Sequence, residues 1–243
     1  MKIKAIVSYN GKRYQGWQKQ DNTLTVQGVI EETLSTYLNS ETKIYGSGRT
    51  DTGVHAFGQV FHFETLKDID IDQMRYSLNR MLPDDIHIKS LEVVDNSFHA
   101  RFSLKDKTYE YRISFKEKDP LERDNVYVCP FPTDIDTFKK CLLLFKGKHD
   151  FRNFTSKEED EDNFIRDIYD ISFSDEEDTL VITFKGNGFM RYMIRFIVGV
   201  SLAIAQGKEN EAYINKYLDN KDERHIVSYK AIASGLTLKK VTY

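Results

Sequence analysis

The sequence predicts an α+β protein made of two halves that repeat one order of strands and helices. Alternating apolar and polar residues mark the strands, and apolar residues with a period near 3.6 mark the helices. The order of these signals in residues 1–104 returns in residues 105–243, so we expect a domain boundary between them. Each half then has the order β-α-β-β-α-β.

In the first half we expect strands at 2–9, 42–46, 58–64 and 87–94, and helices at 25–38 and 70–81. The first strand, KIKAIVSY, alternates clearly, and a turn-rich loop follows it. The helix at 25–38 has Val26, Ile30 and Leu34 at helical spacing, and Thr25 precedes them as an N-cap. These local signals define the first half.

In the second half we expect strands at 107–115, 166–174, 179–186 and 236–242, and helices at 134–146 and 189–206. Both halves match the split βαβ (RRM/ferredoxin-like) arrangement, with helices on one face of an antiparallel sheet. We expect the two sheets to form a continuous platform whose other face is uncovered. Such a face, when it carries aromatic residues, is a common platform for RNA, but fold class alone does not settle function.

The charge pattern permits a polyanionic partner without requiring one. The net charge is −3, but five acids lie in 157–163 and four lie in 174–178. Without these nine, the rest of the chain carries 29 acidic residues against 35 basic ones. Two acidic loops can therefore coexist with a basic surface elsewhere.

The sequence predicts a cytoplasmic protein with no membrane segment. No signal peptide is visible at the start, and the longest apolar run, 196–205, is too short to span a bilayer. The two cysteines, Cys129 and Cys141, lack metal-site spacing and indicate a reducing compartment. His55 and His62 are seven residues apart across a turn, so we expect no metal site.

The segment 46–63, GSGRTDTGVHAFGQVFHF, is a candidate site because it places Asp51 on a glycine-flanked turn before a strand. Gly46, Gly48 and Gly53 can adopt backbone conformations that other residues avoid, and they allow a ligand to approach closely. The segment is neither a P-loop nor an EF-hand. From the residues alone, two readings of Asp51 stay open: a functional carboxylate, or an ordinary turn residue that bonds its own backbone.

Two further features carry chemistry-bearing residues. Arg191 and Arg195 lie four residues apart in the apolar segment GNGFMRYMIRFIVGVS, where a guanidinium usually has a carboxylate partner. Either they pair with an acid such as Asp51, or both reach the surface. Alternation places Tyr109 and Tyr111 on one face of a strand. We expect Tyr111 in the core, whereas Tyr109 is equally compatible with the core and with stacking on a base.

Five segments resemble the TruA-type tRNA pseudouridine synthases, in the same order along nearly the whole chain. They are YNGKRYQGWQKQ (9–20), GRTDTGVHAFGQVFHF (48–63), FHARFSLKDKTYEYRI (98–113), HDFRNFTS (149–156) and GFMRYMIRFIVG (188–199). The sequence departs from the usual family pattern at 192–196 and at 234–238, which puts the substrate range in doubt but leaves the site residues unchanged.

This resemblance implies an enzyme that isomerises uridine to pseudouridine in the tRNA anticodon stem-loop, at positions 38, 39 or 40. It implies Asp51 as the catalytic carboxylate, Tyr109 stacked on the target base and Arg195 paired with Asp51. Arg49 would hold the flipped nucleotide. Lys12 and Arg13 are expected phosphate contacts. The resemblance also implies a homodimer that needs no cofactor and no metal.

The chemical path stays open at this stage. The carboxylate can attack C1′, deprotonate the sugar on the way to a glycal, or add to C6 of the base. The main alternative function is a non-catalytic RNA-binding protein on the same fold, which would not need the carboxylate. A glycoside hydrolase or nucleosidase is a second alternative, but it normally needs another acid opposite Asp51.

Overall fold

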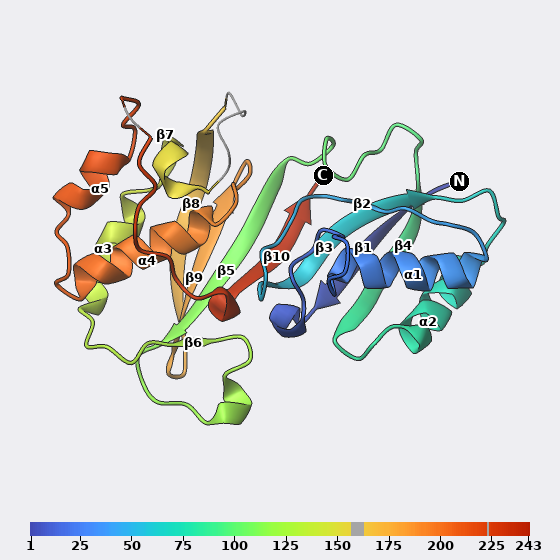
Figure 1. Cartoon of the computed structure of the whole chain (residues 1–243), viewed down its shortest axis with the longest axis horizontal. Coiled ribbons are helices and arrows are strands. Elements are labelled where there is room, and N and C mark those ends of the chain that lie inside the picture. Colours follow the sequence, from blue (N-terminus) through green and yellow to red (C-terminus); the bar gives the residue numbers. More distant parts are fainter. Residues whose placement is uncertain (157–162, 223) are drawn as a thin grey trace. The chain divides into compact units, whose positions relative to one another are not determined.

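The structure is a computed structural model that describes residues 1–156, 163–222 and 224–243. The chain forms two compact units, Met1–Lys105 together with Thr237–Tyr243, and Asp106–Leu236. Each unit contains a largely antiparallel sheet and its own helices (Figure 1). The α+β class that the sequence predicts is therefore confirmed.

The first unit has a sheet in the order β4-β1-β3, with two further strands beside β3. Its strands are β1 (Lys2–Tyr9), β2 (Tyr45–Gly46), β3 (His55–Glu64), β4 (Ile86–Val94) and β10 (Leu236–Thr242). Its helices are η1 (Gly11–Arg13), α1 (Val26–Leu38) and α2 (Ile71–Met81). β2 pairs antiparallel with β3 at Phe61 and His62, whereas β10 pairs parallel with β3 at His55 and Ala56.

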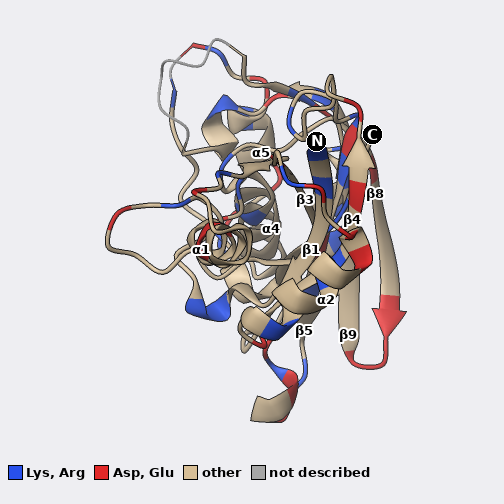
Figure 2. Ribbon diagram, turned by 90° about the vertical axis from the view of Figure 1, so that its right-hand side faces the viewer, with Lys and Arg blue, Asp and Glu red and all other residues tan. Residues whose placement is uncertain are grey.

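The core of the first unit lies between its sheet and helices α1 and α2, which contact each other on one side of the sheet (Figure 2). Ile3, Ala5 and Val7 of β1 point into this core because alternate residues of a strand share a face. Full burial of each large side chain here contributes about 1.5–3 kcal/mol. α1 begins as predicted, because the Thr25 side chain accepts a hydrogen bond from the Gly28 backbone N–H at 3.3 Å.

The second unit has a sheet in the order β6-β5-β9-β8-β7. Its strands are β5 (Asp106–Ser114), β6 (Tyr127–Val128), β7 (Gly147–Asp150), β8 (Ile165–Glu176) and β9 (Thr179–Gly186). Its helices are η2 (Pro120–Glu122), α3 (Ile135–Leu143), η3 (Arg152–Phe154), α4 (Met193–Ala205), α5 (Ala212–Tyr217) and η4 (Ala233–Gly235). α3 and α4 contact each other, so the second unit repeats the helix pair of the first.

Helix α4 is buried on all sides except at one residue. All of its residues from Met193 to Ala205 are buried apart from Arg195, which is partly exposed. The helix begins four residues later than predicted, because Tyr192 adopts a left-handed conformation with φ 63° and ψ 0°. The predicted helix at 189–206 would have placed Arg191 one turn before Arg195 on the same face, but Arg191 precedes the helix.

The structure differs from the sequence prediction in its short elements and in its last strand. The predicted strand at 58–64 begins at His55, and β6, β7 and α5 were not predicted because they are too short to show a period. Residues 237–243, which the sequence analysis assigns to the second half, group with the first unit. The parallel pairing of β10 with β3 accounts for this.

One of the two acidic segments forms the turn between β8 and β9, where Figure 2 shows red residues at the end of the hairpin. Two of its acids form ion pairs within the second unit. Arg112 contacts Glu176 at 2.8 Å, and Lys116 contacts Asp178 at 2.5 Å. Much of this charge is therefore neutralised locally. The other acidic segment, 157–162, lies outside the described residues.

Candidate functional site

The Asp51 turn connects β2 to β3 and is held by its buried neighbour Thr50. The Tyr9 hydroxyl and Thr50 Oγ1 are 2.7 Å apart, and the Trp17 backbone N–H donates to the Thr50 carbonyl at 3.1 Å. The side chains on either side of Thr50 face outward: Arg49 is exposed and Asp51 is partly exposed. Burial of one residue thus fixes a short turn that presents an arginine and a carboxylate.

Residues 9–20 pack directly against this turn and complete its surroundings. The Gly53 N–H donates to the Tyr14 carbonyl at 3.3 Å, and the Val54 N–H donates to the Asp51 carbonyl at 3.1 Å. Gly16 has φ +87°, and a Cβ atom there would lie 2.7 Å from the Thr50 carbonyl oxygen. Close approach of the two backbones is therefore possible only because residue 16 has no side chain.

Gly46, Gly48 and Gly53, the glycines that flank the Asp51 turn, have different roles. Gly53 has φ +76°, in the left-handed region that favours glycine. Gly46 lies against the indole of Trp17, where a Cβ would be 2.6 Å from Nε1. The Gly48 carbonyl accepts a hydrogen bond from Gln59 Nε2 at 3.0 Å. Of the three, only Gly53 uses a backbone conformation that other residues avoid.

Lys12 and Arg13, the predicted phosphate contacts, lie in η1 of the first unit and are both exposed. The Asn10 side chain accepts a hydrogen bond from the Lys12 N–H at 3.1 Å and caps this short helix. Arg13 Nη1 contacts Asp85 Oδ2 at 3.2 Å, while its side chain stays 66% exposed. A surface ion pair of this kind contributes little stability, so it leaves Arg13 available to a second anion.

In the second unit, Tyr109 and Tyr111 lie on the same face of β5, as alternation predicts. Tyr111 is fully buried, which confirms its predicted place in the core, and its hydroxyl donates to the Ile232 carbonyl at 2.9 Å. Burial raises the pKa of the Tyr111 hydroxyl. Tyr109 is 7% exposed, and its ring packs against that of Phe189 in a T-shaped arrangement with centroids 5.3 Å apart.

Arg195 lies in the first turn of α4, where its guanidinium bonds the chain segment that precedes η4. Arg195 Nε donates to the Ala231 carbonyl at 2.8 Å, and the Ala231 N–H donates to the Arg195 carbonyl at 2.8 Å. Asp51 belongs to the first unit, whereas Tyr109 and Arg195 belong to the second. The pairing of Arg195 with Asp51 therefore remains a prediction.

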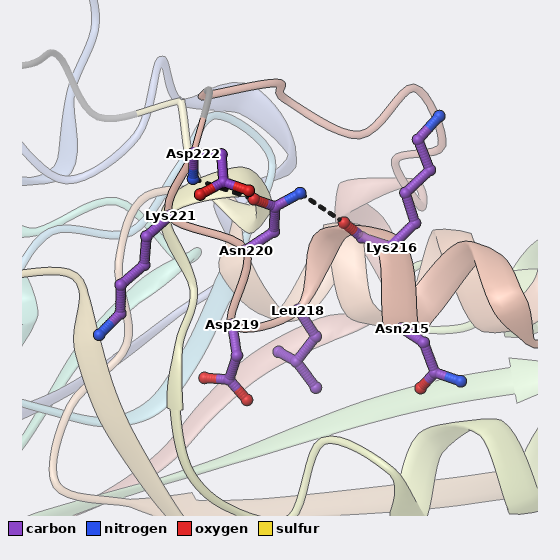
Figure 3. Close-up of a pocket in the computed structure, with 7 residues that line it drawn as sticks. All are labelled: Asn215, Lys216, Leu218, Asp219, Asn220, Lys221 and Asp222. Carbon is purple, nitrogen blue, oxygen red and sulfur yellow. Dashed lines mark hydrogen bonds between the residues drawn. The ribbon is translucent and has the colours of Figure 1, made fainter.

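A separate surface hollow of about 670 Å³ lies at the end of α5 (Figure 3). Its lining comes from one continuous segment, residues 215–222. Asn220 Nδ2 donates to the Lys216 carbonyl and the Asp222 N–H donates to Asn220 Oδ1, both at 3.0 Å. The hollow contains none of the predicted site residues and is built from local turn contacts.

Tyr192 and Lys230 adjoin Arg195, and the sequence did not single out either of them as a site residue. Lys230 Nζ lies 4.3 Å from the centre of the Tyr192 ring, and the Arg195 guanidinium carbon lies 5.2 Å from it. No local pattern marks Lys230, because it is 35 positions from Arg195 in the chain. Within the described residues, no group of three or more His, Cys, Asp or Glu side chains is arranged to hold a metal ion, and no helix has the length and apolar character needed to cross a membrane.

Comparison with known proteins identifies the family. A family model described as tRNA pseudouridine synthase matches residues 5–103 and 142–243. The chain is 41% identical to tRNA pseudouridine synthase A of Geobacillus sp. (strain WCH70), covering 100% of this chain and 98% of that protein. It is 40% identical to tRNA pseudouridine synthase A of Listeria monocytogenes serotype 4a, with 100% and 99% coverage. It is 39% identical to tRNA pseudouridine synthase A 1 of Bacillus cereus (strain ATCC 14579), with 100% and 98% coverage. The chain belongs to the tRNA pseudouridine synthase family.

Proposed function

We propose that the protein isomerises uridine to pseudouridine in the tRNA anticodon stem-loop, at one or more of positions 38, 39 and 40. The observation that carries the proposal is the end-to-end similarity to relatives named tRNA pseudouridine synthase A. The Asp51 turn supports it, because a buried Thr50 and a close Gly16 hold one partly exposed carboxylate in a fixed position.

The reaction needs few groups because it is balanced within the substrate. The N1–C1′ bond breaks, the uracil turns, a C5–C1′ bond forms, C5 loses its proton and N1 gains one. There is no net oxidation or reduction. We assign to Asp51 the role at the sugar, either attack on C1′ or removal of a sugar proton towards a glycal. We assign to Arg195 the task of keeping that carboxylate ionised.

Tyr109 supplies the remaining contacts to the base in this proposal. A uridine in a stem must leave the stack at a cost of a few kcal/mol. Stacking on an aromatic ring returns about 1–3 kcal/mol. Tyr109 keeps a small exposed area while its ring packs against Phe189, which supports contact with one base. We also assign removal of the C5 proton to the Tyr109 hydroxyl.

Recognition of the tRNA, in this proposal, relies on shape and phosphates more than on base edges. Arg49 beside Asp51 and the exposed Lys12 and Arg13 in η1 are the first-unit cations that we assign to the RNA. All three lie in the two segments that pack around Thr50. We further propose that the protein acts in the cytoplasm as a homodimer.

The proposal is tested with transcribed tRNA that carries tritium at C5 of uracil. We expect release of tritium to water without release of free uracil, because the base stays in the chain. A tRNA with cytidine at positions 38 to 40 serves as the control and should release none. Release of free uracil would instead indicate a nucleosidase. Tight, salt-dependent tRNA binding with no tritium release would favour the non-catalytic RNA-binding protein.

A further inference from the structure

Three cations surround one aromatic ring at the start of α4. The guanidinium carbons of Arg191 and Arg195 lie 4.9 and 5.2 Å from the centre of the Tyr192 ring, and Lys230 Nζ lies 4.3 Å from it. Arg191 Nη2 also donates to the Tyr192 hydroxyl at 3.1 Å. We call these four residues the Tyr192 cluster. All of them belong to the second unit.

The Tyr192 cluster gathers three positive charges, and the aromatic ring of Tyr192 stabilises them only in part. A cation over an aromatic ring is attracted by the negative face of the ring, but cations gathered on one ring also repel one another. In the described part of the chain, neither Arg191 nor Lys230 forms an ion pair with a carboxylate. Both side chains are exposed, so a ligand in solution can reach them.

The backbone builds this arrangement from segments that are distant in sequence. Paired hydrogen bonds of 2.8 Å join Arg195 to Ala231 and bring Lys230 to the first turn of α4. Gly199 lets the two segments approach, since a Cβ there would lie 2.6 Å from the Tyr229 carbonyl oxygen. Thr155 Oγ1 donates to the Arg191 carbonyl at 3.0 Å. Packing and hydrogen bonds therefore hold together the backbone segments that carry these cations.

The conformation of Tyr192 is a second, independent sign of a built site. Its φ of 63° and ψ of 0° place a bulky residue in the left-handed region, which is a strained conformation for a residue with a side chain. Such strain persists only where the surroundings determine it, and it concentrates at functional sites. Here the left-handed turn directs the ring to where all three cations meet it.

We propose that the Tyr192 cluster binds phosphate groups of the tRNA substrate, with Arg191 and Lys230 as the phosphate ligands and Tyr192 as the residue that positions them. This inference rests on the proposed function, because it takes tRNA as the polyanion. An RNA backbone presents successive phosphates and so matches separate cations held near one point. The first-turn N–H groups of α4 add positive potential next to Tyr192, the residue that precedes the helix.

The test compares the salt dependence of tRNA binding in the wild type, Lys230→Ala and Arg191→Ala. Each lost phosphate contact should reduce the slope of log affinity against log salt by about 0.7–0.9. At physiological salt we expect about threefold to tenfold weaker binding for each variant. The turnover number at saturating tRNA should stay within about twofold of wild type, so KM changes and kcat does not.

Lys216→Ala is the matched control, because Lys216 Nζ lies 5.1 Å from the centre of the Tyr217 ring in the same unit. It removes one exposed lysine from one ring and should leave the salt slope unchanged. Tyr192→Asn tests the positioning role, because asparagine tolerates the left-handed conformation but has no ring. We expect Tyr192→Asn to weaken tRNA binding as much as Lys230→Ala does. Tyr192→Phe, which keeps the ring, should bind tRNA nearly as tightly as the wild type.

The outcomes separate this inference from the proposed function. If Lys230→Ala and Arg191→Ala keep the wild-type slope while the wild type releases tritium, the cluster is not a phosphate site and the isomerase proposal stands. If the slope falls in both variants but the wild type releases no tritium, the phosphate site stands and the isomerase proposal fails. If the wild type shows no salt-dependent tRNA binding, the inference is overturned.

Discussion

Gly16→Ala should disable the Asp51 turn, although residue 16 lies 35 positions away from Asp51. Two penalties combine at this position. A φ of +87° costs alanine about 1–2 kcal/mol. The new Cβ would also lie 2.7 Å from the Thr50 carbonyl oxygen and 3.3 Å from the Asp51 carbonyl carbon, and the atom in conflict is rigid backbone. Overpacking of this kind costs about 1–3 kcal/mol.

Gly207→Ala separates the two penalties. Gly207 has φ +69°, but nothing lies within 4 Å of a Cβ built there. Gly207→Ala should therefore lower the free energy of unfolding by about 1–2 kcal/mol, through backbone strain alone. Gly16→Ala should lose about 2–5 kcal/mol, the sum of both terms.

The assay combines thermal and urea unfolding with tritium release at a temperature where both variants are folded. Fluorescence of Trp17, the single tryptophan, reports locally because that residue follows Gly16 and is 1% exposed. We expect Gly16→Ala to lower kcat at least tenfold, because displacement of the Asp51 turn misplaces the carboxylate. Gly207→Ala should keep its kcat. Equal activity and equal stability of the two variants would refute the packing argument.

Three further predictions concern stability and reactivity. Burial, followed by the nearby charges, lowers the pKa of His62 from 6.5 to about 4 in the folded protein. As the pH falls, the histidine is therefore protonated in the unfolded chain before it is protonated in the folded one, which favours unfolding. Lowering the pH from 7 to 5 should reduce the free energy of unfolding of the wild type by about 1–2 kcal/mol through His62. The His62→Gln variant should lose less stability over the same range. The same pH dependence of stability in both proteins would contradict this. Asn153 is buried, and its side chain hydrogen-bonds three backbone groups of the 217–225 segment. Urea unfolding should therefore show that Asn153→Ala lowers the free energy of unfolding by about 2–4 kcal/mol. The control Asn210→Ala, at an exposed position, should lower it by under 1 kcal/mol. Burial raises the pKa of the Cys141 thiol to about 11, so a thiol reagent at pH 8 should modify it only after unfolding, and rapid labelling of the folded protein would contradict its burial.

Local signals in the sequence predicted most of the regular elements because the physics behind them is local. Thr25 caps α1 as expected, since its side chain and the Gly28 N–H that it accepts from are three residues apart. The first strand matches its alternation from Lys2 to Tyr9. The start of α4 was predicted too early because a left-handed Tyr192 has no signature in a pattern of apolar residues.

The arrangement of the site depends on contacts that no local pattern contains. The turn at Asp51 was predicted from its glycines, but its fixed position comes from Thr50, Tyr9 and Gly16, which come from separate parts of the chain. The proximity of Lys230 to Arg195 likewise comes from backbone pairing across 35 residues. Family resemblance indicated the candidate residues, and packing explains how the Asp51 turn and Arg195 are held.

The most direct test of the central claim is a single-turnover experiment with the enzyme in excess over tRNA, comparing wild type with Asp51→Asn. Asparagine keeps the shape of the side chain and removes its negative charge, so the Thr50 contacts should persist. Asp21→Asn, an exposed acid in the loop before α1, is the control. Nucleoside analysis of the product should show pseudouridine with wild type and Asp21→Asn, and none with Asp51→Asn although it still binds tRNA. Pseudouridine formed by Asp51→Asn at a rate near that of wild type would contradict the account.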